Sequence, residues 1–88
     1  MKITEIRVSG KFEKQYRKLP DKIRKVAREK ESIFRNNPFD PRLNTHKLHG
    51  KDREAWAFSI TGFCRIKFIF LTSESVLFLE IGTHDIYQ

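Results

Sequence analysis

Eighty-eight residues, of which 39% are hydrophobic and eight are Phe, suffice for one compact core and not for two. We therefore expect a single domain over residues 1–88 and exclude a disordered chain. Lys and Arg number 18 against 11 Asp and Glu, and the net charge of +7 favours a polyanionic partner, either nucleic acid or an acidic protein. The single Cys64 excludes a disulfide framework, and no apolar run approaches ~18 residues, so we expect a cytoplasmic protein without a membrane segment.

The first third of the chain predicts one strand followed by two helices. Residues 3–8 carry β-branched side chains at the spacing of a short strand. Ser9 suits the N-cap of a helix over residues 10–18, where apolar side chains recur at helical spacing. Pro20 is tolerated in the first turn of a helix and not in its interior, so it separates this helix from a second one that ends at residues 36–38.

The polar faces of both predicted helices are strongly basic. A charge run of this kind is usually a solvated face, and its one-sidedness also leaves room for a role facing an anion. The cations of this face are Lys11, Lys14, Arg17, Lys18, Lys22, Arg24, Lys25, Arg28 and Arg35.

The second half of the chain predicts a three-stranded meander after an irregular stretch over residues 37–53. Residues 54–60 alternate large and small side chains, and residues 64–71 and 76–81 form a hairpin around a short polar turn. The order strand, helix, helix, strand, strand, strand indicates an α+β fold, with both helices packed on one face of a mostly antiparallel sheet.

Alternation along the strand at residues 64–71 divides its side chains between the two faces of the sheet. Its apolar face consists of Cys64, Ile66, Phe68 and Phe70. Arg65 and Lys67 then lie on the opposite face, away from the helices. We expect Cys64 to be a buried filler in this pattern.

Candidate chemical groups gather before the second strand, at the start of the third and after the fourth. They are His46, Lys47, His49, Lys51, Arg53, Arg65, Lys67, His84 and Tyr87. No nucleotide-binding or metal-binding motif accompanies them, so we expect neither a cofactor nor a metal. The set suits metal-free cleavage of RNA, in which the 2′-hydroxyl is the nucleophile and the protein moves protons and neutralises the phosphorane.

Each of these residues also has a purely structural interpretation. His84 is either an exposed tail residue or a proton-transfer group, with Asp85 orienting it or merely ending the strand. Tyr87 either packs on the sheet edge, stacks on a base or donates its hydroxyl. Arg65 can instead pair across the sheet with Glu80 or Glu54, and His46 and His49 can be loop residues without a role.

Four stretches, in their order and spacing, resemble the RelE/ParE superfamily of toxins from type II toxin–antitoxin systems. The first runs from Ser9 through Phe12, with Gln15 where a Lys is usual, to Lys18, Leu19 and Pro20. The others are L-x-G at residues 48–50, G-x-x-R-I at residues 62–66 and the terminal G-T-H-D at residues 82–85. The resemblance covers essentially the whole chain, and the terminal G-T-H-D is its most specific part.

The resemblance implies a small βααβββ fold similar to microbial ribonucleases. It further implies a hydrolase of the mRNA interferase type, an endoribonuclease that binds RNA, cleaves mRNA in the ribosomal A site and inhibits translation. An acidic, partly disordered antitoxin is the implied partner, beside ribosome and mRNA. Operator DNA is expected only through the toxin–antitoxin complex.

Site residues follow from the same resemblance. Arg65 matches the strand arginine that binds the scissile phosphate, and His84 matches the C-terminal acid or base of YafQ-like and YoeB-like members. Tyr87 lies where these toxins carry an aromatic residue near the mRNA, and His46 resembles a histidine of YafQ-like members, with Thr45 in place of the preceding Asp. We expect the phosphate-binding set to be Lys47, Lys51, Arg53 and Lys67.

Two other functions fit the same fold. A ParE-like inhibitor of DNA gyrase needs no acid–base residues, so the G-T-H ending favours the nuclease over it. A catalytically inactive relative would only bind an antitoxin and its operator.

Overall fold

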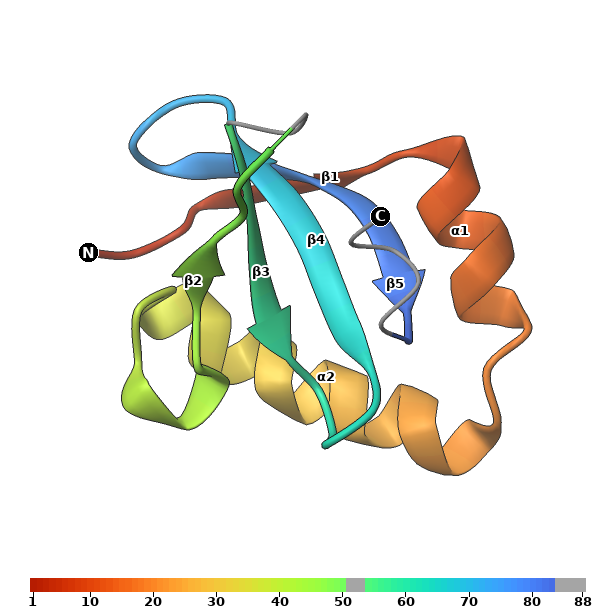
Figure 1. Ribbon diagram of the computed structural model, residues 1–88. Helices are drawn as coiled ribbons and strands as arrows, with labels where there is room; N and C mark the ends of the chain where they lie inside the picture. The colour runs from red at the N-terminus through yellow and green to blue at the C-terminus, as the bar shows by residue number, and fades with distance from the viewer. Residues whose placement is uncertain (51–53, 84–88) are drawn as a thin grey trace.

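The computed structural model describes residues 1–50 and 54–83, in which two helices pack on a five-stranded sheet (Figure 1). The predicted α+β class is confirmed. In chain order the elements are β1 (Glu5–Val8), α1 (Gly10–Arg17), α2 (Asp21–Asn36), the short 3-10 helix η1 (Pro41–Leu43), β2 (His46–Lys47), β3 (Ala55–Ser59), β4 (Arg65–Phe70) and β5 (Ser75–Gly82).

The strands lie in the order β1-β5-β4-β3-β2, so the first strand of the chain lies beside the last. The predicted meander of β3, β4 and β5 is antiparallel throughout. β1 pairs with β5 in parallel, which makes the sheet mixed, and β2 pairs antiparallel with β3. β1 and β5 are far apart in the sequence, and β2 has only two residues. Local sequence patterns therefore predict neither pairing.

The prediction that residues 37–53 are irregular was wrong for two segments. η1 forms because Asp40 accepts a hydrogen bond from the backbone N–H of Arg42 and Pro41 occupies the first turn. β2 forms because His46 and Lys47 pair with Ala57 and Trp56 of β3. Two residues of the stretch before the meander thereby become part of the sheet.

Both helices begin and end where their residues predict. The Ser9 hydroxyl accepts a hydrogen bond from the backbone N–H of Phe12 at 3.0 Å and donates to the carbonyl of Leu79 in β5. Ser9 therefore caps α1 and also fastens it to the sheet. Pro20 precedes α2, and Asn37 ends it in extended backbone. Neither helix is both long and apolar enough to cross a membrane among the described residues.

The core lies between α2 and the sheet and is built from aromatic rings. Phe34 of α2 is completely buried, with its ring stacked on Phe58 at 4.5 Å between centroids and edge-on to Phe68 at 5.0 Å. Phe78 of β5 is 5.4 Å from Phe12 of α1, so the same cluster joins both helices. Cys64 is buried beside these rings as expected, and burial raises the pKa of its thiol.

Candidate functional site

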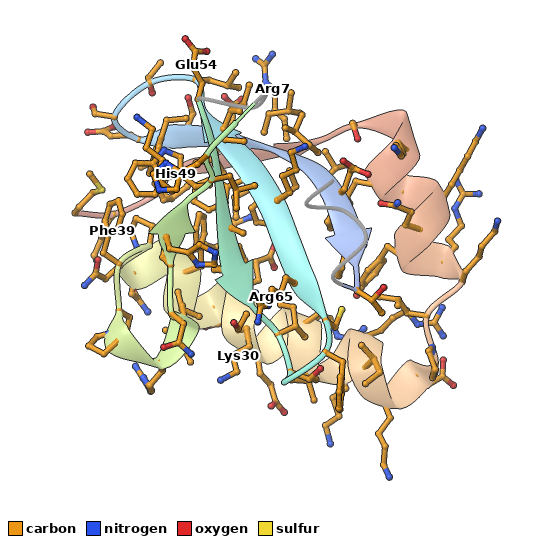
Figure 2. The ribbon with its side chains drawn as sticks, viewed as in Figure 1. Arg7, Lys30, Phe39, His49, Glu54 and Arg65 are labelled. Carbon is orange, nitrogen blue, oxygen red and sulfur yellow. The ribbon has the colours of Figure 1, made fainter. Side chains whose placement is uncertain are left out.

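The sheet face that points away from α2 carries the polar side chains of the central strands, and we call it the open face. It is defined by His46, Ser59, Arg65, Lys67 and Glu80. The register aligns His46 with Ala57, Lys67 and Glu80 across four strands. The next row contains Ser59, Arg65 and Gly82. Arg65, labelled in Figure 2, and Lys67 therefore lie opposite the aromatic core, as strand alternation predicts.

Lys67 is buried on this face, which sequence alone did not indicate. It is 7% exposed, and its ammonium lies 3.5 Å from one carboxylate oxygen of Glu80. Lys11 at the start of α1 contacts the other oxygen of Glu80 at 2.9 Å. Glu80, one of the two cross-strand partners considered for Arg65, is thus engaged by two lysines. Lys67 holds β4 to β5 and does not present its ammonium freely at the surface.

Glu80→Gln should destabilise the fold by about 1–3 kcal/mol, because it removes a carboxylate that faces a buried ammonium. Urea unfolding measures this free energy. Lys11→Ala serves as the control, since the Lys11 side chain is 66% exposed and exposed ion pairs contribute about 1 kcal/mol or less. Equal stabilities of Glu80→Gln and the wild type would show that Lys67 does not depend on this carboxylate.

The ring of His46 has a defined orientation at the edge of the open face. Its Nδ1 lies 2.9 Å from the backbone carbonyl of Asn44. A carbonyl oxygen can only accept, so Nδ1 carries the hydrogen and donates it. In the neutral imidazole, Nε2 is then the basic nitrogen. His46 is exposed, which leaves its ring within reach of a ligand on this face.

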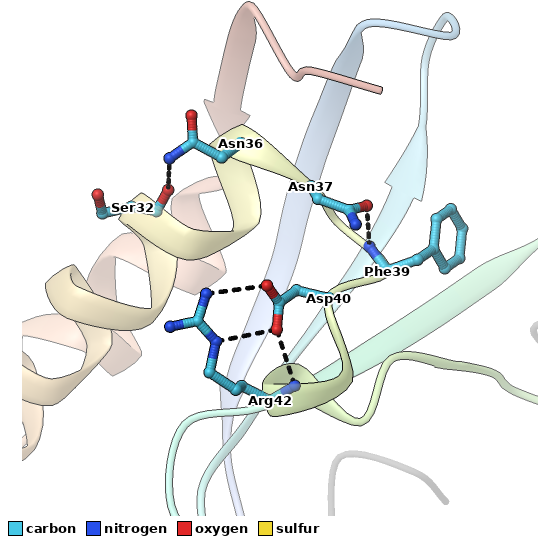
Figure 3. A network of polar contacts seen from close by, with 6 residues as sticks. All are labelled: Ser32, Asn36, Asn37, Phe39, Asp40 and Arg42. Carbon is cyan, nitrogen blue, oxygen red and sulfur yellow. Dashed lines mark hydrogen bonds and ion pairs between the residues drawn. The ribbon is translucent and has the colours of Figure 1, made fainter.

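The backbone before His46 is shaped by side-chain hydrogen bonds (Figure 3). Asn37 accepts from the N–H of Phe39, and Asp40 accepts from both the backbone and the guanidinium of Arg42. Asn44 then adopts a left-handed conformation with φ of 50°, which Asn tolerates better than most residues. The sequence signals for this turn are an Asp before Pro and an Asn after a short helical turn, and the prediction of an irregular stretch took neither into account.

Asp40→Asn should remove the part of the free energy of unfolding that the wild type loses at acid pH. The side-chain and backbone hydrogen bonds from Arg42 lower the pKa of the Asp40 carboxyl from 3.8 to about 2. A carboxyl with a depressed folded pKa stabilises fully above its unfolded pKa and loses this contribution as pH falls through its folded pKa. Between pH 3.8 and about 2, wild-type stability should therefore fall more steeply than that of Asp40→Asn. Parallel urea titrations across this range would contradict the role of Asp40.

No family model and no curated protein matches the sequence significantly, whereas solved structures match the fold over nearly its whole length. A YoeB/ParE toxin from Agrobacterium tumefaciens is 13% identical, with a TM-score of 0.79 over 92% of this chain and 99% of that one. The toxin–antitoxin complex RelBE2 from Mycobacterium tuberculosis matches at 16% identity and a TM-score of 0.77, over 96% and 100%. The fold is that of the RelE/ParE toxins. The DinJ-YafQ toxin–antitoxin complex of E. coli, at 17% identity and a TM-score of 0.75 over 98% and 97%, has it too.

In this RelE/ParE fold the sheet brings only some of the predicted site residues together. His46, Arg65 and Lys67 share the open face, and the end of β5 reaches it because Gly82 pairs with Arg65. Lys47 does not share it. It pairs with Trp56 and its ammonium lies 5.9 Å from the centroid of that ring, on the side of the aromatic core.

The remaining predicted positions are not placed by the structure. His84, Tyr87, Lys51 and Arg53 lie outside the described residues. His49 is exposed, and it lies near the end of the molecule that carries Phe39 (Figure 2). Within residues 1–50 and 54–83, no three His, Cys, Asp or Glu side chains gather in a way that could hold a metal ion.

A groove of about 590 Å³ lies between α1, α2 and the sheet, on the sheet face opposite the open face. Its apolar lining is Val8, Phe12, Tyr16, Ala27, Ile66 and Phe78. Charged side chains at its rim are Glu13, Arg17, Arg28 and Glu31. The groove combines an apolar floor with a rim of two acidic and two basic side chains, which is a surface suited to an amphipathic protein segment.

Proposed function

We propose that this protein is the toxin of a type II toxin–antitoxin system and acts as a ribosome-dependent mRNA endonuclease. The observation that carries the proposal is the open face of a RelE/ParE fold, which holds Arg65 on β4 and, two strands across and one row along, His46 on β2, an imidazole with a basic Nε2. An arginine binds phosphate oxygens through two parallel hydrogen bonds. A histidine moves protons near neutral pH. Together they meet the minimum that RNA cleavage requires.

The reaction uses a nucleophile that the RNA itself supplies. A histidine takes the proton of the 2′-hydroxyl, and the resulting oxygen attacks the adjacent phosphorus. Arg65 neutralises the charge of the phosphorane. The bond to the 5′-oxygen then breaks, that oxygen receives a proton, and the products are a 2′,3′-cyclic phosphate and a 5′-hydroxyl. No step requires a metal ion.

The roles of individual residues within this scheme follow the resemblance and the geometry together. His84 and His46 are the proposed proton-transfer groups, and Tyr87 is the proposed aromatic contact with the mRNA. Lys47, Lys51 and Arg53 are proposed to hold RNA phosphates outside the reacting centre. Lys67 acts mainly through Glu80, because its ammonium is buried against that carboxylate.

The proposed partners are a cognate antitoxin, the ribosome and its mRNA, all in the cytoplasm. The groove between the helices supports the antitoxin, since its apolar floor suits one face of a helix and Arg17 and Arg28 at its rim suit acidic side chains. Two of the matching structures are described as toxin–antitoxin complexes. Contact with operator DNA is proposed only through the complex with the antitoxin.

Expression of the isolated chain in cells, followed by primer extension on an abundant mRNA, tests this function. We expect growth arrest and cuts within codons that appear only while translation runs and disappear in His84→Ala. Arrest with DNA breaks and without such cuts would replace the proposal by gyrase inhibition. Absence of arrest would favour an inactive antitoxin-binding relative.

A further inference from the structure

An exposed aromatic ring stands at the turn that leads into Arg65. Phe63 is 81% exposed, more than any other large hydrophobic residue among residues 1–50 and 54–83. Leaving a Phe side chain in water forgoes roughly 1.5–3 kcal/mol that burial would contribute. One exposed Phe needs no explanation by itself, so its surroundings decide the argument.

The turn that carries Phe63 is held in a fixed shape. The hydroxyl of Thr61 accepts hydrogen bonds from the backbone N–H groups of Phe63 at 3.2 Å and of Cys64 at 3.0 Å. The N–H groups of Ile60 and Thr61 both donate to the carbonyl of Cys64, whose side chain is buried. The ring is therefore displayed by a hydrogen-bonded turn that is anchored in the core.

The position of this turn relative to Arg65 indicates what the ring meets. Phe63 precedes Arg65 by two residues, so their Cα atoms are at most roughly 7 Å apart. A phosphate bound by Arg65 brings the attached nucleotide to this end of the open face. Unstacked RNA bases are commonly held on Phe, Tyr or Trp rings, because every base has a π-face.

We propose that Phe63 is a positioning residue on which a base next to the scissile phosphate stacks. This inference rests on the proposed endonuclease function and adds to it the contact that orients the nucleotide at Arg65. Orientation matters because the 2′-hydroxyl must lie in line with the leaving oxygen before attack. The ligand is thus a single-stranded RNA segment, recognised at this point by stacking and not by sequence.

Four variants separate stacking from simple apolar contact. Phe63→Tyr and Phe63→Trp keep an aromatic face, Phe63→Leu keeps an apolar side chain without one, and Phe63→Ala removes both. Leu71→Ala is the matched control, since Leu71 is another exposed hydrophobic residue, 43% exposed, at the turn after β4. The four variants and the control should unfold at the same urea concentration as the wild type, because these side chains are exposed.

The readout uses ribosomes programmed with an mRNA that carries 2-aminopurine in the A-site codon and a 2′-deoxy sugar that prevents cleavage. We expect the wild type, Phe63→Tyr and Phe63→Trp to quench the fluorescence of this base on binding. Phe63→Ala and Phe63→Leu should not quench it, and they should bind roughly 5- to 150-fold more weakly. Cleavage of the all-ribose mRNA should slow in the same two variants.

The outcomes distinguish this inference from the function on which it rests. If the wild type cleaves and Phe63→Ala matches it, base stacking is wrong and the endonuclease stands. If Phe63→Leu behaves like the wild type, the ring serves an apolar contact, such as one with a protein, and the inference is again wrong. If the wild type neither binds nor cleaves on ribosomes, the proposed function fails and this inference fails with it.

Discussion

Arg65→Ala should reduce mRNA cleavage by about 10²- to 10³-fold, the loss seen when one charge-stabilising donor is removed from a transition state. Arg65 begins β4 on the open face, and its register neighbours are Ser59 and Gly82. β4 fixes the backbone from which this side chain extends, and the proposed contact with the scissile phosphate uses its guanidinium. Arg65→Lys should keep the charge and recover only part of the rate, because an ammonium lacks the planar fork that binds two phosphate oxygens.

A matched arginine separates this effect from the loss of one positive charge. Arg7 of β1 is exposed and lies at the top of the view in Figure 2, whereas Arg65 lies well below it, near the centre. Arg7→Ala removes the same charge and should change the cleavage rate little. Rates are compared on programmed ribosomes, and urea unfolding verifies that each variant is folded. An Arg65→Ala protein that is folded and fully active would exclude Arg65 from phosphate binding.

The local features of this fold could be predicted because local physics determines them. The hydroxyl of Ser9 caps α1, the ring of Pro20 separates the helices, and alternation places Arg65 opposite Ile66. Each of these depends on residues within a few positions of one another. β2 and the parallel pairing of β1 with β5 could not be predicted in this way, because partners that are distant in sequence supply their hydrogen bonds.

The Glu80–Lys67 pair shows a second limit of prediction from sequence. Strict alternation along β5 would put Glu80 on the same face as Phe78, in the core. The pairing of β4 with β5 shifts by one residue between Lys67 and Phe68: Lys67 pairs with Glu80, and Phe68 pairs with Phe78. Because of this extra residue in β5, the side chain of Glu80 lies on the open face. The side chain of Gln15 accepts a hydrogen bond from the N–H of Ile81 next to this irregularity. The sequence signal of such a bulge is weak, since it depends on these contacts.

Phe34→Ala should destabilise the protein by about 3–5 kcal/mol, the largest stability effect we expect. Phe34 is completely buried, and its ring lies 4.5 Å from Phe58, 5.0 Å from Phe68 and 5.6 Å from Phe78. Removing it leaves a cavity bounded by three rings that strands β3, β4 and β5 hold in place. Domains of this size have total stabilities of about 5–15 kcal/mol, so the variant should be partly unfolded at modest urea concentrations.

Phe63→Ala is the control for this deletion, because it removes the same atoms from a ring that is 81% exposed. Its stability should change by less than about 0.5 kcal/mol. Urea unfolding measures both free energies of unfolding, and the two can be compared if the dependence of the free energy on urea concentration is unchanged. A Phe34→Ala protein as stable as the control would mean that the helices do not depend on this aromatic cluster. Two causes of lost activity can therefore be distinguished. We expect Phe34→Ala to lose cleavage because the fold is destabilised, and Arg65→Ala to lose cleavage although the fold stays intact.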